Sequence, residues 1–278
     1  MIKDILVHIP TERPMRPVID GSVSLAAGLG AHLDAVSIGY LATSTAYVMD
    51  GGAAVAAVFE MERERAVERA ETALTVFETE ARNAAISYTC CPIGSIPADA
   101  ASSVGAMARL YDLCVVLQPD SEQASFDNDL PREILIQSGG PVLFLPHIFR
   151  GTFKTRRIGI CWDGSRASAR ALRDATPLLK HAESIVIITV NEADAVPAEA
   201  SADNLARHLA RLGLSSRTIG LSAARSDIQP TILSLAADES LDLLVMGGYG
   251  HSRLQESFLG GVTRAMFEAM TVPTLMSH

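Results

Sequence analysis

The chain has 278 residues, 48% of them hydrophobic, and this length suits two domains of about 140 residues with buried cores. Its 23 basic and 32 acidic residues give a net charge of −9, which argues against a broad nucleic-acid-binding surface. We find no apolar run as long as a membrane span, no secretion signal in MIKDILVHIP, and no cysteine or histidine spacing typical of disulfide frameworks or zinc sites. We therefore expect a cytoplasmic protein without nucleic-acid or membrane partners.

A charged helix is predicted at about residues 61–81 of the first half. Its apolar face indicates packing on one side, while Glu and Arg side chains point into solvent. The face consists of Val67, Ala70, Leu74, Phe77 and Ala81. A coiled-coil partner for this helix is the alternative, although the stretch spans only about three heptads. The preceding residues 41–58, rich in Ala, Gly and Ser, are expected to form a mobile loop or a short helix.

The two halves of the chain repeat one pattern. The first apolar strand, within IKDILVHIP, is echoed by RRIGICWDG, and Pro141 and Pro273 occupy matching places 132 positions apart. This repeat predicts a tandem duplication, with domains at residues 1–148 and 154–278. The segment 147–155 is the expected linker.

Strands and helices alternate along the second half, and this pattern predicts a parallel sheet with right-handed crossovers that cover both faces. The strand candidates lie near residues 158–162, 184–190, 217–221, 241–246 and 273–276. One helix is marked by Leu205, Leu209 and Leu212 on a single face, and Gly213 is expected to stop it.

A glycine-rich segment, GGYGHSRLQESFLGGVT at residues 247–263, follows the predicted strand that ends at Met246. At the carboxyl end of a parallel strand, Gly247 and Gly250 would let backbone amides approach an anion closely. Arg253 lies within the segment and suits either a phosphate contact or an exposed surface.

A helix is expected to start directly after Gly260 and Gly261, at Val262 and Thr263. The free amides and the positive dipole end of that helix would face the same anion. Thr263 adds a hydroxyl donor, and Arg264 is a second cation with the same two possible roles.

Asp163 follows the first strand of the second half, in CWDGSRAS. In a doubly wound sheet this strand neighbours the one that ends at Met246, so the Asp163 carboxylate would face the glycine-rich segment. There it could accept hydrogen bonds from ribose hydroxyls or hold a magnesium ion that bridges phosphates. The alternative role is the N-cap of a helix that begins near Ser165.

The spacing Gly-x2-Gly-x9-Gly after an apolar strand resembles the ATP-binding pattern of the universal stress protein family, and both halves resemble its fold. The resemblance implies an α/β fold with two tandem, doubly wound, five-stranded parallel sheets of strand order 3-2-1-4-5, related by a pseudo-two-fold axis. Family domains pair through their last strands, here near Val142–Leu145 and Thr274–Ser277. The resemblance also implies a bound adenine nucleotide, ATP or AMP, which Mg²⁺ could accompany.

Carried over by position, the resemblance assigns nucleotide-binding roles to one set of residues in the second half. They are Asp163 on the ribose and metal side, Val190 at the adenine, Met246 and Gly247 at the adenosine, and Gly250, Gly260, Gly261, Val262 and Thr263 at the phosphates. The sequence departs from the family at Gly261, where the pattern usually has Ser or Thr. This departure bears on affinity and on the preference for a triphosphate, not on the location of the site.

The first half departs from the pattern throughout. Residues 117–120 read Leu-Gln-Pro-Asp where the second half has its first glycines; proline removes an amide and the acid repels phosphate. Asn128 and Asp129 replace the later glycine pair, and the acid after the first strand is missing. We therefore expect an empty or differently occupied first half with a structural role.

Catalytic motifs are missing, since the sequence has no GxSxG, no HExxH and no paired carboxylates at the candidate site. His251 and Ser252 adjoin the glycine-rich segment without a third group to orient them, so we assign no catalytic residue. The leading expectation is a stress-response protein that binds an adenine nucleotide at one site in the C-terminal half and acts as a sensor or regulator. The alternatives are a scaffold that binds no nucleotide, a tandem protein for another small ligand, and a slow ATPase. A homodimer of the whole chain stays open.

Overall fold

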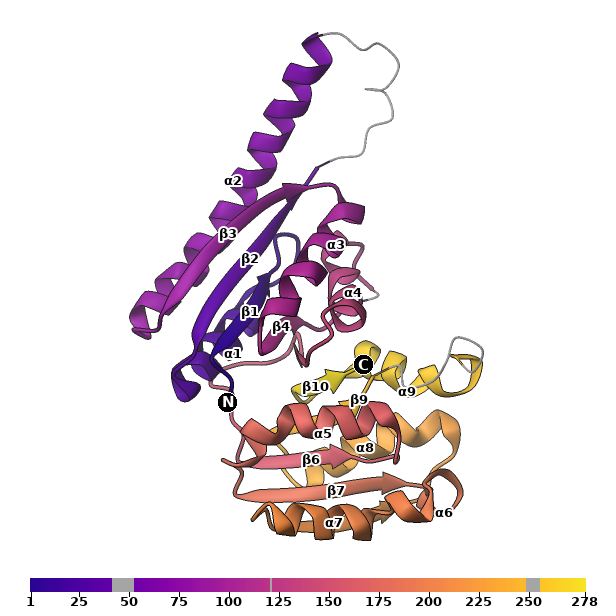
Figure 1. Ribbon diagram of the computed structural model, residues 1–278. Helices are drawn as coiled ribbons and strands as arrows, with labels where there is room; N and C mark the ends of the chain where they lie inside the picture. Colours follow the sequence, from indigo (N-terminus) through magenta and orange to yellow (C-terminus); the bar gives the residue numbers. More distant parts are fainter. Residues whose placement is uncertain (42–52, 121, 249–255) are drawn as a thin grey trace.

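Figure 1 shows a computed structural model of the protein, which describes residues 1–41, 53–120, 122–248 and 256–278. The first half contains β1 (Asp4–Ile9), α1 (Arg16–Leu29), β2 (His32–Tyr40), α2 (Ala53–Asn83), β3 (Tyr88–Ser95), α3 (Pro97–Met107), η2 (Ala108–Leu110), β4 (Leu113–Leu117), η3 (Phe126–Asn128), α4 (Leu130–Gln137) and β5 (Val142–Leu145). The second half contains β6 (Arg157–Cys161), α5 (Arg166–Leu179), β7 (Ser184–Val190), α6 (Glu192–Ala195), η4 (Ala198–Ala200), α7 (Ala202–Arg211), β8 (Ser216–Leu221), η5 (Arg225–Asp227), α8 (Ile228–Asp238), β9 (Leu243–Gly247), α9 (Glu256–Ala269) and β10 (Thr274–Ser277).

The strands of the described residues form one continuous sheet in the order β3-β2-β1-β4-β5-β10-β9-β6-β7-β8. Each half has the predicted order 3-2-1-4-5 with parallel neighbours, and the two halves meet where β5 pairs antiparallel with β10. The expected pairing through the last strands is therefore confirmed, and it merges the two predicted sheets into one.

The register of this junction shows the pseudo-two-fold axis directly. Leu143 pairs with Leu275, which lies 132 positions later, at the same offset that relates the two prolines. The flanking pairs, Phe144 with Thr274 and Val142 with Met276, exchange under the same offset. The axis therefore passes through the Leu143–Leu275 pair.

Helices cover both faces of the sheet, and each face buries its own apolar cluster. Helices α1, α2, α5 and α7 pack on one face, where their side chains meet strand residues such as Ile5 and Val7. Helices α3, α4, α8 and α9 pack on the other face against residues such as Leu6 and Val116. Consecutive residues of β1 thus serve opposite cores, as the period of a strand requires.

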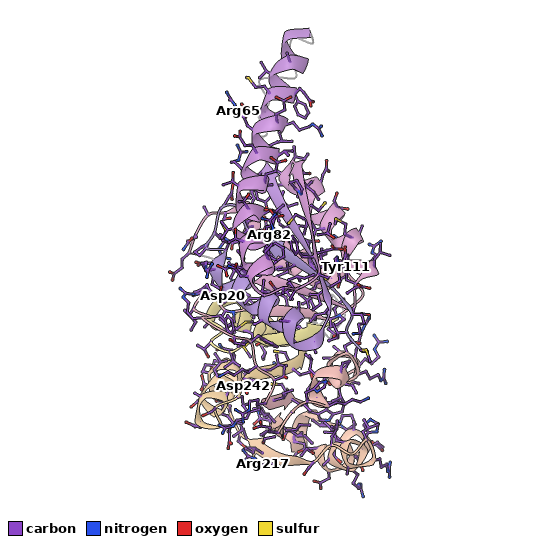
Figure 2. The ribbon with its side chains drawn as sticks, turned by 90° about the vertical axis from the view of Figure 1, so that its left-hand side faces the viewer. Asp20, Arg65, Arg82, Tyr111, Arg217 and Asp242 are labelled. Carbon is purple, nitrogen blue, oxygen red and sulfur yellow. The ribbon has the colours of Figure 1, made fainter. Side chains whose placement is uncertain are left out.

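Helix α2 is longer than the predicted helix, because it begins at Ala53 rather than near residue 61. Its stretch of Ala, Glu and Arg contains no glycine or proline to stop it. The predicted apolar face packs on the sheet, with Ala70, Leu74, Phe77 and Ala81 buried. Toward its N-terminus α2 extends past the sheet (Figure 1), and Figure 2 shows Arg65 on this extension and Arg82 beside the body. Of the stretch expected to be a loop or short helix, residues 42–52 lie outside the described residues.

The predicted helix around Leu205 and Leu209 is present as α7, and both leucines are buried. Leu212 was assigned to the same face, but it lies after the end of α7 and is 49% exposed. The chain turns away at this point because Gly213 takes a φ of +77°. The expected stop at Gly213 is therefore correct, and it takes effect early enough to exclude Leu212 from the core.

The segment between the halves is packed against the body. Phe153 is 6% exposed within the core cluster of the α1 face, and its amide donates to Ser24 Oγ at 2.9 Å. In the part of the chain that the structure describes, no helix is long and apolar enough to cross a membrane. The four cysteines form no disulfide.

Candidate functional site

The carboxyl ends of β6 and β7 bring two of the predicted site residues to one edge of the sheet. Cys161 pairs with Ile188 across these strands, and the amide of Trp162 donates to the Ile188 carbonyl at 2.8 Å. Asp163 and Val190 each lie two residues beyond this pair. They therefore leave neighbouring strands side by side, Asp163 exposed and Val190 half-buried.

Strand β9 brings the next two residues to the same edge from the other side of β6. Ile160 pairs with Val245, so Met246 and Gly247 end β9 beside Trp162. The Met246 side chain is only 6% exposed and belongs to the core cluster under α8 and α9. Only the backbone of Met246 is therefore placed to meet a ligand at this edge.

Gly247 has a packing reason to be glycine. A Cβ added there would lie 2.6 Å from the backbone nitrogen of Ser168 and 2.8 Å from Ala167 Cβ. The end of β9 thus lies directly against the first turn of α5. Any side chain at this position would push the strand and the helix apart.

Asp163 shapes the turn that leads into α5 and keeps its carboxylate at the surface. Its Oδ1 accepts a hydrogen bond from the Ser165 amide at 2.9 Å, and Gly164 takes a φ of +69° in this turn. The N-cap of α5 is Ser165, whose Oγ accepts from the Ser168 amide at 3.1 Å. The alternative that made Asp163 the N-cap is therefore wrong, and its exposed carboxylate stays available to a ligand.

The expected helix start at Val262 is wrong, because α9 already begins at Glu256. Gly260 and Gly261 lie within the helix, where amides beyond the first turn are bonded to carbonyls four residues earlier. Thr263 is 4% exposed, so its hydroxyl does not face solvent. A glycine inside a helix costs only about 1 kcal/mol, so packing along α9 can carry the helix through both glycines.

The remaining phosphate-side residues divide into two groups. Gly250, His251, Ser252 and Arg253 lie outside the described residues. Arg264 forms an ion pair with Glu268 of the same helix, with Nε and Oε1 2.9 Å apart. Its side chain is 80% exposed, which fits the surface alternative for this residue.

Half-buried apolar side chains, not foreseen from the sequence, end the strands on both sides of Val190. Leu221 at the end of β8 pairs with Val190, and Cys161 ends β6 on the other side of β7. We call Cys161, Val190 and Leu221 the apolar rim; all three pack against the core cluster of that face, as do Ile228 of α8 and Val262 of α9. The sequence did hold a signal for this rim, because the strands concerned end in apolar residues. Burial, and secondarily the charge of Asp163, raise the pKa of Cys161 to about 12, so its thiol stays protonated and is a poor nucleophile.

Residues 154–278 match the sequence model of the universal stress protein family. The second half of the chain therefore belongs to this family. A comparison with curated proteins finds no match. Among solved structures, a universal stress protein from Archaeoglobus fulgidus is similar with a TM-score of 0.70 at 16% identity, covering 98% of this chain and 97% of that one. A proposed universal stress protein of Pseudomonas aeruginosa has a TM-score of 0.59 at 14% identity, covering 99% of this chain and 93% of that one.

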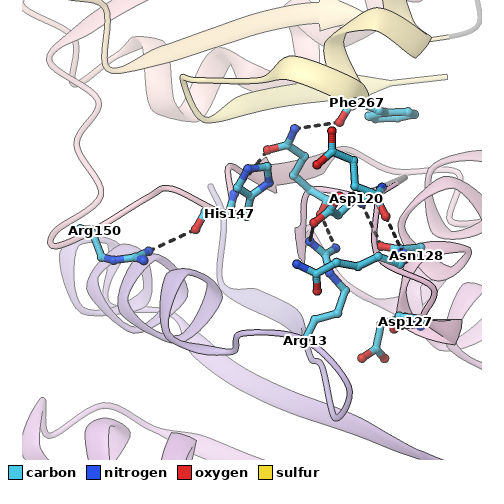
Figure 3. Close-up of polar contacts among 11 residues, drawn as sticks. Arg13, Asp120, Asp127, Asn128, His147, Arg150 and Phe267 are labelled. Carbon is cyan, nitrogen blue, oxygen red and sulfur yellow. Dashed lines mark hydrogen bonds and ion pairs between the residues drawn. The ribbon is translucent and has the colours of Figure 1, made fainter.

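The first half of the chain fills the equivalent edge with its own side chains (Figure 3). The Arg13 side chain, 1% exposed, donates from Nη1 to the Gln118 carbonyl at 2.6 Å and approaches Asp120 to 3.7 Å. Asn128 accepts from the Asp120 amide at 2.9 Å and donates to the Asp120 carbonyl at 2.8 Å. These contacts close the carboxyl ends of β1 and β4, where the second half has Asp163 and Gly247.

Asp127 is the centre of a second polar network in the first half, and its side chain is buried. Its carboxylate accepts hydrogen bonds from the Tyr40 hydroxyl at 2.8 Å and from the Glu12 amide at 2.9 Å. His8 Nε2 lies 3.6 Å from the same carboxylate. We expected the first half to be empty or differently occupied, and its edge is occupied by the half itself.

Burial determines the protonation of the groups around Asp127. It lowers the pKa of His8, and the nearby Asp127 charge only partly opposes this shift. Burial together with the Asp127 charge raises the pKa of Tyr40, so the phenol remains a hydrogen-bond donor. The network therefore combines a neutral imidazole and a protonated phenol with one carboxylate.

A metal ion at the second-half site would depend on its ligand. Within the described ranges, no three His, Cys, Asp or Glu side chains gather as a metal site. Asp163 could supply one oxygen to Mg²⁺, which commonly takes few protein carboxylates and completes its shell with phosphates and water. The described residues thus fit a magnesium ion whose remaining ligands a bound nucleotide would supply.

Proposed function

We propose that this universal stress protein binds an adenine nucleotide at a single site in its second half and acts as a stress-response sensor or regulator. The observation that supports this proposal most directly is the position of Asp163. Its exposed carboxylate follows β6 and lies next to the apolar rim at Val190, at the carboxyl edge of β6, β7 and β9. A purine needs an apolar surface and a ribose needs a hydrogen-bond acceptor, and this edge offers them on adjacent strands.

Two further observations support the same site. A Cβ added to Gly261 would meet no atom of the described residues within 4 Å, so this position of α9 does not face the packed core. Gln229, in the first turn of α8, is 7% exposed, and its Nε2 has no hydrogen-bond partner among the described residues. A buried amide without a partner is uncommon, and a ligand atom at this edge would satisfy it.

The proposed roles follow from position. Val190 and its rim would hold the adenine, and Asp163 would accept the ribose hydroxyls and contact any magnesium ion. The phosphates would lie toward Gly250, Gly260 and Gly261, with Val262 and Thr263 beyond them, Gly247 providing the close approach of the backbone. No residue is assigned to turnover, so binding rather than hydrolysis is the proposed activity.

The scaffold alternative also has a specific observation in its favour. Because α9 includes Gly260 and Gly261, its first free amides lie earlier than the family pattern requires. Calorimetric titration of the purified protein with ATP and AMP separates the two functions. Saturable binding of either supports the proposal, whereas the lack of any bound or co-purifying nucleotide supports the scaffold.

Replacing Asp163 with alanine is expected to weaken ATP binding about tenfold, since a charge-assisted hydrogen bond is lost. Asp238→Ala is the matched control, because Asp238 is an exposed aspartate at the far end of α8 and should leave affinity unchanged. Equal affinities for both variants in the same titration would remove Asp163 from the site.

Gly261→Ser is expected to tighten ATP binding about threefold to tenfold, because it restores a hydroxyl donor beside the phosphates. Among the described residues, no atom lies near enough to Gly261 to clash with the added Cβ. Gly261→Ala stabilises the helix in a similar way without a hydroxyl, so it is the control. If both variants change the measured dissociation constant equally, the effect comes from the helix and not from a phosphate contact.

A further inference from the structure

Two contacts join the first half to the two sides of the segment proposed to bind phosphates. Gln118 donates from Nε2 to the carbonyl oxygen of Phe267 at 2.7 Å, and Phe267 lies in the last turn of α9. On the other side, Leu135 of α4 packs on Gly248, the residue after β9. A Cβ added to Gly248 would lie 3.0 Å from Leu135 Cδ2.

These two contacts are equivalent under the pseudo-two-fold axis, yet they differ in chemistry. Leu135 and Phe267 are 132 positions apart. Gln118 and Gly248 each follow the fourth strand of their half, and their amides donate to the last residues of β5 and β10 respectively, at 2.8 and 2.9 Å. Each half therefore places the residue after its fourth strand against the last helix of the other half: Gln118 against α9, and Gly248 against α4. In one direction the contact is a side-chain amide, and in the other it is a bare glycine.

Gln118 is held within the first half by hydrogen bonds from two of its residues, Arg13 and His147. It is fully buried, and its Oε1 accepts from the His147 amide at 3.3 Å. Its own carbonyl accepts from the buried guanidinium of Arg13 at 2.6 Å. Carbonyls in the last turn of a helix cannot be satisfied by that helix, so the Gln118 amide gives α9 a partner from the other half.

We propose that the first half is a positioning domain for the nucleotide site of the second half. Gln118 holds the end of α9 and Leu135 abuts the residue that leaves β9, so together they fix the distance between the two elements that carry the glycines. Arg13, one of the side chains that fill the first half's own edge, serves this purpose because it fixes Gln118. This inference rests on the proposed function.

The first test uses Gln118→Met, which keeps the length of the side chain and removes the donor. We expect ATP affinity to fall about fivefold, as the loss of one buried hydrogen bond permits. We also expect faster hydrogen exchange in residues 263–269 of α9. Both are measured well below the thermal transition, where a purely structural loss of stability would leave the affinity of the folded protein unchanged.

The second test uses complementary sizes at the other contact. Gly248→Ala is expected to weaken ATP binding about fivefold, since the new methyl group presses on the end of the Leu135 side chain and disturbs the contact between α4 and the end of β9. Adding Leu135→Val removes the terminal methyl groups that the alanine meets and should restore affinity to within about twofold of wild type. Gly140→Ala is the control, because the nearest atom to its added Cβ is 3.8 Å away.

The outcomes separate the inference from the proposed function. Wild-type protein that binds ATP, with Gln118→Met and Gly248→Ala equally tight, overturns the positioning role and leaves the site in place. A loss in Gly248→Ala that Leu135→Val does not repair also overturns it, since Gly248 would then act within its own half. Wild-type protein that binds no nucleotide overturns both.

Discussion

Replacing Gly39 with alanine is expected to lower the free energy of unfolding by about 3 kcal/mol. Gly39 lies in β2, directly under α2, and an added Cβ would stand 1.7 Å from the Ala66 carbonyl oxygen and 2.3 Å from its carbon. These are backbone atoms of a helix, so no side-chain rotation relieves the clash. Helix α2 would have to move away from the sheet, and the packing of Leu74 and Phe77 would loosen with it.

Gly28→Ala is the matched control for this prediction. Gly28 lies in α1, and an added Cβ would meet no atom within 4 Å. Alanine there should raise the free energy of unfolding by about 0.5–1 kcal/mol, because it restricts the unfolded chain and favours the helix. Urea unfolding of both variants provides the measurement. A Gly39→Ala variant within about 0.5 kcal/mol of wild type would contradict the close approach of α2 to β2.

Replacing Asp127 with alanine is expected to cost about 3 kcal/mol of stability. The carboxylate is 3% exposed and accepts from the Tyr40 hydroxyl and the Glu12 amide. Its removal leaves both donors without this acceptor in the protein interior. The pKa of Tyr40 is raised by burial, so the phenol cannot avoid the loss by ionising.

Two controls make the Asp127 result specific. Asp129→Ala removes an exposed acid two residues away that makes no side-chain cap on α4, and it should change stability by less than about 0.5 kcal/mol. Tyr40→Phe removes one stranded donor, so combining it with Asp127→Ala should cost less than the sum of the single changes. Strict additivity in chemical denaturation would show that the two side chains do not act together.

Most of the fold could be predicted because it depends on patterns within short stretches. Apolar strands, intervening helices and the repeated prolines predicted a duplicated α/β fold with parallel sheets. The order 3-2-1-4-5 in each half and the pairing of the last strands were implied by the resemblance to the universal stress protein family. The limits of α2 and α9 were harder to predict. A propensity pattern marks where a helix is weakened, as at Gly260 and Gly261, whereas packing decides where it begins.

The candidate site was predictable where residues follow a strand, and less so where they depend on distant partners. Asp163 and Val190 leave neighbouring strands, so topology alone brings them together. Met246 is buried by α8 and α9, and strand position does not reveal that. The network around Asp127 joins residues more than 80 positions apart, with Tyr40 and Glu12 at separations of 87 and 115. No local pattern marks such contacts.

The junction of β5 and β10 within one chain frees the two halves from symmetry. In a dimer of identical chains, every substitution appears twice, so one partner cannot close its edge with Arg13 and Asp127 while the other keeps Asp163 exposed. Here the two partners are separate stretches of one chain, so their sequences can differ and they are always present at a ratio of one to one. Their association also does not weaken on dilution, because the linker keeps them at a fixed effective concentration.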